Sequence, residues 1–531
     1  MRAHEALVLL LAAAACGGED TIEAPPAATS PTADGPGPAA PGAPAGEAAW
    51  FREVGPTAGL DASRSMSAEE PRAIVEVKGG GLALFDLDGD GDLDLLDPGQ
   101  GSFAEAAVPR LYENRSSDEG RLAFRALERD VPMPHWPMGL AVGDLDGDGA
   151  SDLFVSAHGA NAALYNRSLG DDASQRTLVD RAAEVGLAHE GFGMAAALAD
   201  LDGDGDLDLY LVNYLQLDLE DLPPDIEFVG QRIFAGPLGL TPEADVIYEN
   251  LDDGSFKDRS FRSGIGVAPP SFGLGVTAVD LDEDGDLELF VGNDSMRNFV
   301  YVNAGGMRFD ERAMELGLAS NADGREQATM GIAGTDLNGD DHIDLFTTNF
   351  AADTNTLFVS RVDRPWRDRT APMGLTATGR AQVGWASVFG DFDLDGDEDL
   401  VAFNGHTYPD RVALRLGSAN RQEPLAWARD GKRFTAAQAD AAWRTELFCG
   451  RGAARADLDG DGDLDLVASA WRDRVRLYEG TAADGSTKVP QLSVRLDRPA
   501  VGDRFGFGAR VTLTEGDTTT TRWVQPTMGF Q

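Results

Sequence analysis

The amino-acid sequence predicts an all-β fold, a seven-bladed β-propeller followed by a short C-terminal β segment. Three observations lead to this prediction: one acidic motif recurs seven times, each copy lies between two short apolar runs, and successive copies are spaced like propeller blades. The composition agrees, because 63 glycines and 27 prolines among 531 residues indicate many turns and short elements.

The overall charge limits the kind of partner that the chain can have. There are 44 basic against 90 acidic residues, which gives a formal net charge of −46. We expect no nucleic-acid partner, because a phosphate backbone requires clustered Lys and Arg. Hydrophobic residues make up 42% of the chain, which indicates a folded body and not an acidic disordered tail. The two cysteines cannot build a disulfide framework.

The first 16 residues resemble a bacterial lipoprotein signal peptide. Arg2 precedes an apolar run at residues 6–15 that is too short to span a bilayer, and the run leads directly into Cys16. The resemblance implies that Cys16 carries the lipid, and Gly17 after it favours the outer membrane or cell surface of a bacterium. An ordinary secretory signal is the alternative. The other thiol, Cys449, is then expected to be a small core residue.

Residues 17–49 are rich in Ala, Pro and Gly and are predicted to form a flexible tether. The predicted propeller occupies residues 50–485, and a partial C-terminal module occupies residues 490–531. The chain is therefore expected to be an exported protein whose folded body contacts the membrane only through its N-terminal lipid.

The repeated motif reads D-x-D/N-x-D-G-x-x-D/E and is followed by an apolar run. The fifth copy departs from it, because Asp341 takes the place of the glycine. The residues at the first, third, fifth and ninth positions of the seven copies are Asp86, Asp88, Asp90 and Asp94; Asp144, Asp146, Asp148 and Asp152; Asp200, Asp202, Asp204 and Asp208; Asp280, Asp282, Asp284 and Glu288; Asp336, Asn338, Asp340 and Asp344; Asp391, Asp393, Asp395 and Asp399; and Asp457, Asp459, Asp461 and Asp465.

Each copy lies between two predicted buried strands. The first aspartates of successive copies are 58, 56, 80, 56, 55 and 66 residues apart, compared with about 40–50 residues for a four-stranded blade. Gly-led runs such as Gly-Leu-Ala-Leu-Phe at residues 81–85 come before the loop, and runs of four to six residues rich in Leu, Val and Phe come after it. Their length and composition favour short buried strands.

A further element follows most copies, a short turn and then an acidic strand that ends in Gly-Leu, as at residues 178–187 and 366–375. Residues 51–60 carry the same element ahead of the first copy. This offset predicts that the N-terminal strand begins in the middle of a blade and helps to close the ring.

The spacing of the motif predicts calcium binding. Alternating positions one, three and five direct their side chains at one centre, while the glycine permits a sharp turn. The carbonyl of the seventh residue and the carboxylate of the ninth complete a cage of hard oxygen ligands, which Ca²⁺ prefers. Converging carboxylates without a cation would repel each other. We therefore expect up to seven Ca²⁺ ions with a structural role.

An EF-hand and a simple hairpin turn are the two alternatives to this type of calcium loop. An EF-hand requires a bidentate Glu at position 12 and flanking helices. Position 12 holds Asp, Val, Leu, Val, Thr, Ala and Ala in the seven copies, and the flanks are predicted strands. Asp-Gly turns that merely join hairpins are the second alternative, and seven copies in register argue against it.

The loops and their flanking strands resemble FG-GAP/VCBS repeats, the calcium-loop blades of integrin α-chain propellers and of many secreted bacterial proteins. The resemblance covers approximately residues 51–480. The C-terminal residues 506–511, Gly-Phe-Gly-Ala-Arg-Val, are similar to the glycine-rich opening strand of an ASPIC/UnbV domain, here in truncated form. Together these features resemble bacterial relatives of the cartilage acidic protein family.

Two classes of function fit the sequence. The first is a surface-anchored binding or adhesion module for a protein or glycan, in which the insertion between Tyr214 and Tyr248 is either a contact loop or, as we favour, a blade-covering loop with a buried Phe. The second is a propeller enzyme acting on polysaccharide, although no catalytic motif is recognised. The tryptophans Trp136, Trp385 and Trp471 and the strand-end asparagines Asn213, Asn293, Asn349 and Asn404 are expected to serve packing and turns.

Overall fold

A computed structural model describes residues 50–61, 70–169, 172–251, 253–361, 365–376, 379–437, 442–482, 507, 509–515 and 518–524. These residues belong to one compact unit, Trp50–Gln531. The predicted signal peptide, Cys16 and the tether lie outside the described residues. Among the described residues, no helix has both the length and the apolar character needed to cross a bilayer.

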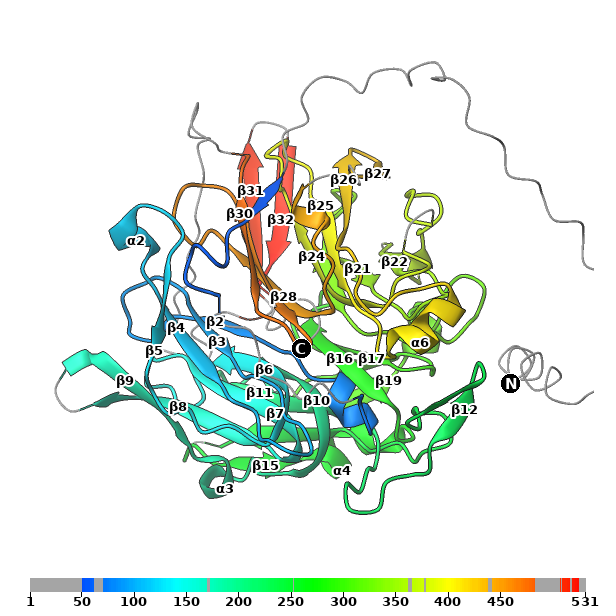
Figure 1. Ribbon diagram of the computed structural model, residues 1–531, viewed down its shortest axis with the longest axis horizontal. Helices are drawn as coiled ribbons and strands as arrows, with labels where there is room; N and C mark the ends of the chain where they lie inside the picture. Colours follow the sequence, from blue (N-terminus) through cyan, green and yellow to red (C-terminus); the bar gives the residue numbers. More distant parts are fainter. Residues whose placement is uncertain are drawn as a thin grey trace, which may run out of the picture. The chain divides into compact units, whose positions relative to one another are not determined.

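The fold is all-β and is built from antiparallel meanders of four strands (Figure 1). Five four-stranded sheets and one eight-stranded sheet are described, and the eight-stranded sheet joins two such meanders through a short pairing of β7 with β10. The all-β prediction is therefore confirmed, and the repeats identify a β-propeller. The described part of the chain holds seven such meanders, and the number of blades in the closed propeller stays a prediction.

The strands of the meanders, in order, are β2 (Ala83–Phe85), β3 (Asp94–Asp97), β4 (Arg110–Asn114) and β5 (Phe124–Leu127); β6 (Trp136–Gly143), β7 (Asp152–Ala160), β8 (Ala162–Leu169) and β9 (Asp172–Asp180); β10 (Glu190–Ala199), β11 (Asp208–Asn213), β14 (Val246–Asn250) and β15 (Phe256–Asp258); β16 (Gly273–Val279), β17 (Glu288–Asn293), β18 (Phe299–Asn303) and β19 (Phe309–Glu311); β20 (Ile332–Thr335), β21 (Asp344–Thr347), β22 (Thr356–Val359) and β23 (Arg367–Asp368); β24 (Gly384–Gly390), β25 (Asp399–Asn404), β26 (Leu425–Asp430) and β27 (Arg433–Ala436); and β28 (Gly450–Ala456), β29 (Asp465–Ala470), β30 (Arg476–Gly480) and β1 (Phe51–Glu53).

Two further hairpins and several short helices complete the described residues. The hairpins are β12 (Ile226–Phe228) with β13 (Gln231–Ile233), and β31 (Arg510–Glu515) with β32 (Thr518–Trp523). The helices are η1 (Ile74–Val77), α2 (Ser116–Glu119), α3 (Ala182–Val185), α4 (Ser260–Ser263), η2 (Ile265–Val267), α5 (Ala313–Leu316), α6 (Asp410–Ala413), η3 (Leu414–Leu416) and η4 (Ala442–Arg444). They are three or four residues long, as expected for a chain rich in turns.

Glycines at the start of the first strands allow neighbouring blades to approach closely. A Cβ atom on Gly331 would lie 1.9 Å from the carbonyl oxygen of Trp385 in the next blade. A Cβ atom on Gly139 would lie 2.7 Å from the carbonyl oxygen of Met194, and one on Gly275 would lie 2.5 Å from that of Met330. Any side chain at these positions would push two backbones apart, which explains the Gly-led runs in the sequence.

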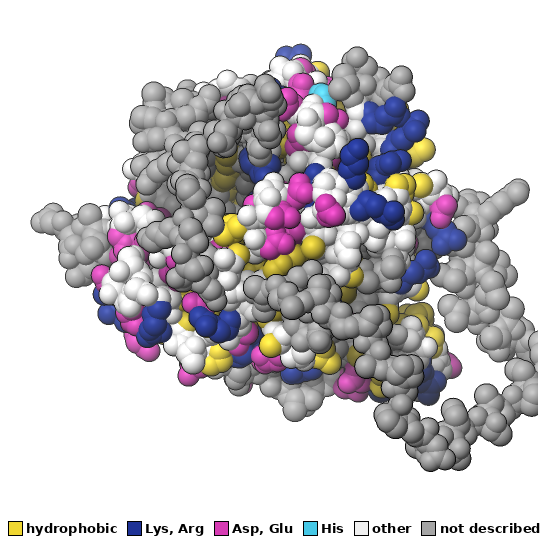
Figure 2. All heavy atoms as spheres, turned by 90° about the horizontal axis from the view of Figure 1, so that it is seen from above, with side chains coloured by type: hydrophobic (Ala, Val, Ile, Leu, Met, Phe, Trp, Pro, Cys, Tyr) yellow, Lys and Arg dark blue, Asp and Glu magenta, His cyan; other side chains and the backbone are white. Residues whose placement is uncertain are grey.

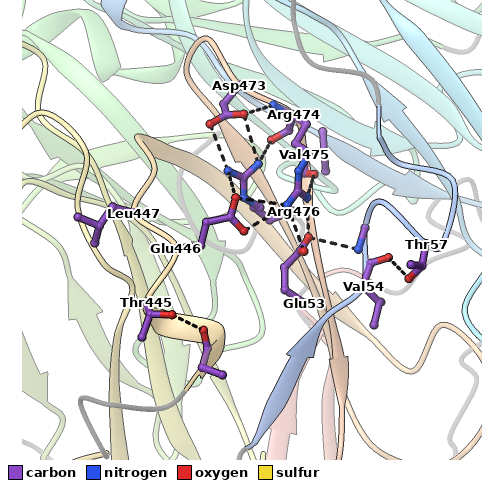
Figure 3. Close-up of polar contacts among 12 residues, drawn as sticks. Glu53, Val54, Thr57, Thr445, Glu446, Leu447, Asp473, Arg474, Val475 and Arg476 are labelled. Carbon is purple, nitrogen blue, oxygen red and sulfur yellow. Dashed lines mark hydrogen bonds and ion pairs between the residues drawn. The ribbon is translucent and has the colours of Figure 1, made fainter.

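The N-terminal strand completes the last blade, as the repeat offset predicts. β1 pairs antiparallel with β30, and Phe51 faces Gly480. The Phe51 ring is buried against Trp443, 5.1 Å between ring centroids, and against Phe392, 5.2 Å away. Arg474 donates to Glu53 on β1 (Nη1–Oε1 2.5 Å), and Figure 3 shows how Arg474 and Arg476 link Glu53 to Glu446 and Asp473.

Substitution of Phe51 by Ala should therefore weaken the closure of the ring. We expect the free energy of unfolding to fall by about 3–5 kcal/mol, because a large buried ring is lost and a cavity remains. Arg52→Ala is the matched control, because this neighbouring side chain is 67% exposed and its ion pair with Glu479 should contribute less than about 1 kcal/mol. Chemical denaturation followed by Trp fluorescence measures both. Equal effects of the two substitutions would show that β1 does not close the ring.

A short segment ahead of the first blade fills the centre of the repeats. Ile74, Val75 and Val77 of η1 are buried in one apolar cluster that takes residues from the first strands of the blades, among them Trp136, Met194 and Trp385. Trp471 donates its indole N–H to the carbonyl of Glu76 (2.6 Å). Trp136, Trp385 and Trp471 are thus buried in the core, as expected.

The core also encloses a polar group. The ammonium of Lys78, which follows η1, lies 3.5 Å from the Asp294 carboxylate, and the Tyr214 hydroxyl donates to the same carboxylate (2.7 Å). Burial lowers the pKa of Lys78, and Asp294 opposes that shift. The Asp294 carboxylate therefore compensates the buried ammonium charge of Lys78, at the point where η1 leads into the first blade.

The 80-residue interval between the third and fourth motifs holds the β12–β13 hairpin. This hairpin packs against the α6 region of the sixth blade. The rings of Phe228 and Phe234 lie tilted against Tyr408, at 5.7 and 5.5 Å between ring centroids, and Arg411 donates to the carbonyl of Arg232 (2.9 Å). Phe234 is 5% exposed. The insertion is therefore the blade-covering loop with a buried Phe that the sequence favours.

Candidate metal sites in the seven acidic loops

Each acidic motif forms the loop between the first and second strands of a blade. The residue at position six takes a left-handed conformation in every copy, from φ 89° at Gly149 to φ 108° at Gly462, with φ 67° at Asp341. The first aspartate accepts hydrogen bonds from backbone N–H groups across the turn; Gly149, for example, donates to Asp144 Oδ2 (2.8 Å). The loop backbone thus wraps around its first carboxylate.

The turn brings carboxylates from different positions together. In the described residues, ligand atoms of three carboxylates lie within 4.8 Å of one another at positions one, three and nine of the second, third, fourth and sixth loops, and at positions one, three and five of the first loop. In the fourth loop, Asp280 Oδ1 is buried without a hydrogen-bond donor among the described residues. A buried, unpaired carboxylate oxygen beside two further carboxylates fits a hard cation such as Ca²⁺.

The ninth carboxylate also makes backbone hydrogen bonds that the spacing of the motif does not predict. Its two oxygens accept backbone hydrogen bonds from the second residue of the same loop and from a residue in or directly after the third strand of the same blade. For Asp152 these are Leu145 N–H (3.0 Å) and Asn166 N–H (2.8 Å). The same pair of bonds holds Asp94, Asp208, Glu288, Asp344, Asp399 and Asp465. The ninth residue therefore fixes the loop to its blade.

Burial raises the pKa of these ninth carboxylates. The main cause is desolvation of the charged form, opposed by the backbone hydrogen bonds and reinforced by the other aspartates of the loop. The pKa rises to about 7 at Asp94 and Asp344 and to about 8 at Asp152, Glu288, Asp399 and Asp465, and it lies well above its ordinary value at Asp208. A divalent cation would offset this cost of burying negative charge.

Asparagine side chains connect consecutive loops around the repeats. Asn166 Nδ2 donates to the carbonyl of Leu87 in the loop of the preceding blade (2.8 Å). Asn250 and Asn303 make the same bond to Leu145 and Leu201. Asn114 donates to Leu458 (3.0 Å), which joins the first blade to the last. The signal in the sequence is an Asn one or two residues after a Tyr in the third strand, and it is hard to recognise because it lies far from the motif.

Asn166→Ala should lower the free energy of unfolding by about 1–3 kcal/mol, because it leaves a buried loop carbonyl without its donor. The matched control is Ser360→Ala at the equivalent position of the fifth blade, where the hydroxyl bonds Asp344 within its own blade (Oγ–Oδ1 3.0 Å). Calcium titration calorimetry should show weaker binding in the first loop for Asn166→Ala, because alanine keeps the backbone N–H that bonds Asp152 and loses only the bond to Leu87 of the preceding blade. Ser360→Ala should weaken binding only in the loop of its own blade. Unchanged stability and calcium binding in Asn166→Ala would contradict the connection between loops.

The structure also places the other residues considered in the sequence. Asn213, Asn293, Asn349 and Asn404 each donate to a backbone carbonyl of the loop after the second strand, at 2.7–2.9 Å, so they stabilise turns as expected. Cys449 is 3% exposed and is a core residue. The loops are flanked by strands, which agrees with the rejection of an EF-hand.

Comparisons with known proteins agree with this architecture. The family model of the FG-GAP-like repeat matches residues 86–155 and 144–211. Mouse cartilage acidic protein 1 is 25% identical over 411 residues, which cover 73% of this chain and 57% of the mouse protein. Its Xenopus tropicalis counterpart is 24% identical over 453 residues, covering 82% and 63%. The chain thus spans about three-fifths of the length of these relatives.

Among solved structures, an Agrocybe aegerita lectin that recognises non-reducing terminal N-acetylglucosamine aligns with 16% sequence identity. The alignment covers 70% of this chain and 84% of the lectin chain, with a TM-score of 0.39.

Proposed function

We propose that this FG-GAP-repeat β-propeller, which is related to cartilage acidic protein 1, is an exported interaction module whose acidic loops bind calcium as a structural ion. The convergence of three carboxylates within 4.8 Å in loop after loop carries this proposal. A lipid on Cys16 would anchor the module to the bacterial outer membrane or cell surface, with residues 17–49 as the tether.

The role of calcium follows from where the loops lie. Every loop joins the first and second strands of a blade, and its ninth residue is bonded to the third strand, so an ion in the loop would hold three strands of the blade together. The carboxylates at the loops would be taken up by the ion and by backbone N–H groups, and in the second loop Asp146 and Asp148 also pair with Arg167. This arrangement suits a structural ion and leaves ligand binding to other surfaces.

The partner of the module is expected to be a protein or a glycan. Seven Ca²⁺ ions would offset fourteen negative charges and leave a chain of net charge −46 strongly acidic. On the face drawn in Figure 2, acidic side chains gather near the centre, and Lys and Arg side chains gather at one side. Such a surface favours a partner that presents basic groups.

The test combines calcium titration with ligand capture on the same purified full-length protein. Calorimetry should show calcium binding at several sites, reduced by Asp282→Asn. A glycan array and a panel of extracellular proteins should show saturable, calcium-dependent retention, and a hydrolase screen should show no turnover. Turnover of a polysaccharide would overturn the proposal in favour of an enzyme, and the absence of calcium binding would overturn the role of the loops.

A further inference from the structure

Three consecutive loops depart from the repeat at positions that do not serve the metal. Position four is Gly in five copies but Glu283 in the fourth, position six is Gly in six copies but Asp341 in the fifth, and position eight is Leu or Ile in five copies but Glu398 in the sixth. No other copy has an acidic residue at an even-numbered position. Even-numbered residues alternate with the predicted ligands, so their side chains are free for another contact.

All three of these acidic residues contact the C-terminal hairpin β31–β32. Arg510 Nη1 lies 3.2 Å from Glu283 Oε1 and donates to the Asp341 carbonyl (3.4 Å). The Thr521 hydroxyl donates to Asp341 Oδ1 (2.6 Å). Arg522 Nε lies 2.5 Å from Glu398 Oε1. The hairpin therefore spans the fourth, fifth and sixth loops, and the off-pattern residue of each loop is the one that it meets.

Two of the departures are unfavourable for the loops themselves. Glu283 and Asp341 have φ angles of 62° and 67°, in the left-handed region that favours glycine. Glycine would relieve this strain, and it is the residue that most other copies have at these positions. The two acidic side chains therefore do not improve the backbone conformation of their own loops, which indicates that they serve a contact outside the loop.

The third departure buries a charge. The Glu398 side chain is only 4% exposed, whereas an apolar residue at this position would cost nothing in desolvation. Arg522 supplies a cation for the buried carboxylate, in addition to Arg455 of β28, whose charge also acts on Glu398. Next to it, Trp523 packs at the edge of an apolar cluster that contains Leu281 and Ile343 from the fourth and fifth loops. The ion pair and the apolar contact together hold β32 against these loops of the propeller (Figure 1).

We propose that Glu283, Asp341 and Glu398 form a docking site for the strands β31 and β32 of the same chain, which present Arg510, Thr521 and Arg522. The site attaches the C-terminal segment to the propeller at the loop face. The propeller would recognise the hairpin through polar contacts, in which two guanidinium groups and one hydroxyl meet three carboxylates on three neighbouring loops. None of these carboxylates belongs to the predicted calcium ligands, so this docking site stands independently of the proposed calcium function.

The test restores the repeat pattern in the full-length protein with the triple substitution Glu283→Gly, Asp341→Gly and Glu398→Leu. Hydrogen exchange followed by mass spectrometry should show amide exchange at residues 510–523 accelerated by at least about tenfold. The matched control is Leu394→Gly, another left-handed residue (φ 60°) of the sixth loop that takes part in none of the hairpin's described polar contacts. In this control variant, the amide exchange of the hairpin should proceed at the wild-type rate.

A reciprocal variant keeps the result independent of any effect on the loops. Arg510→Ser, Thr521→Val and Arg522→Ser change only the hairpin, and they should accelerate exchange at residues 510–523 to the same extent while exchange in the blades stays unchanged. Wild-type exchange of the hairpin in both triple variants would overturn the proposal. Measurements with and without calcium separate this outcome from a failure of calcium binding, which calorimetry reports directly.

Discussion

Removal of calcium is expected to lower the melting temperature of this protein by at least about 10 °C. At a concentration tenfold above the dissociation constant, one ion adds about 1.4 kcal/mol to the stability of the folded state. Seven independent sites would add about 10 kcal/mol, which is comparable to the net stability of a whole domain. Each kcal/mol corresponds to a few degrees or less for a chain of this size.

Differential scanning calorimetry in excess chelator and in millimolar calcium measures this effect. Magnesium at the same concentration should protect less, because it requires a smaller octahedral site. Asp204→Asn removes a predicted ligand of the third loop and should reduce the protection by calcium. Asp206→Asn, two residues further on, removes a carboxylate whose side chain is not a predicted ligand and should leave the protection intact. Equal melting temperatures with chelator and with calcium would refute a structural role for the ion.

The calcium-free protein is expected to lose stability as the pH rises from about 5 to about 8. The pKa of the ninth carboxylate reaches about 8 in four loops, at Asp152, Glu288, Asp399 and Asp465. In the unfolded chain these groups ionise near pH 4. Between the two values the folded state binds more protons than the unfolded state, so each step upward in pH favours unfolding.

Calcium should remove or reverse this dependence, because the ion favours the charged carboxylates and competes with protons. Calcium affinity should therefore fall as the pH falls through the same window. Midpoints of urea unfolding between pH 5.5 and 8.5, with chelator and with calcium, measure both slopes. High salt separates this effect from the general repulsion of an acidic chain, because salt screens exposed charges far more than buried ones. A calcium-free protein that gains stability with rising pH would contradict the burial of protonated carboxylates.

Much of the candidate site could be predicted from the sequence because the motif is local. Nine consecutive residues hold the first, third, fifth and ninth positions, and the turn that Gly149 and its equivalents permit brings several of them together whatever surrounds the loop. The short apolar runs on either side likewise predicted the strands. The offset of residues 51–60 predicted that β1 would complete the last blade, and its pairing with β30 confirms that expectation.

The contacts between blades could not be predicted in the same way. Asn166 and Leu87 are 79 positions apart, and nothing near either residue indicates the other. The second role of Asp152 was missed because its partner Asn166 lies on a strand reached only after the chain has turned. Asp341 was recognised as a departure from the motif, but its meaning required the position of Thr521, 180 residues later.

The repeating unit, the all-β class and the clustering of acidic side chains in the loops follow from residue spacing within one turn and its two flanking strands. The tertiary structure decided which loop meets which blade, what fills the centre of the repeats, and why three loops carry extra acidic residues. Those features depend on the closure of the chain on itself, which places residues hundreds of positions apart in contact. The physical reason is that a hydrogen bond or ion pair is set by distance in space, whereas a sequence pattern records only distance along the chain.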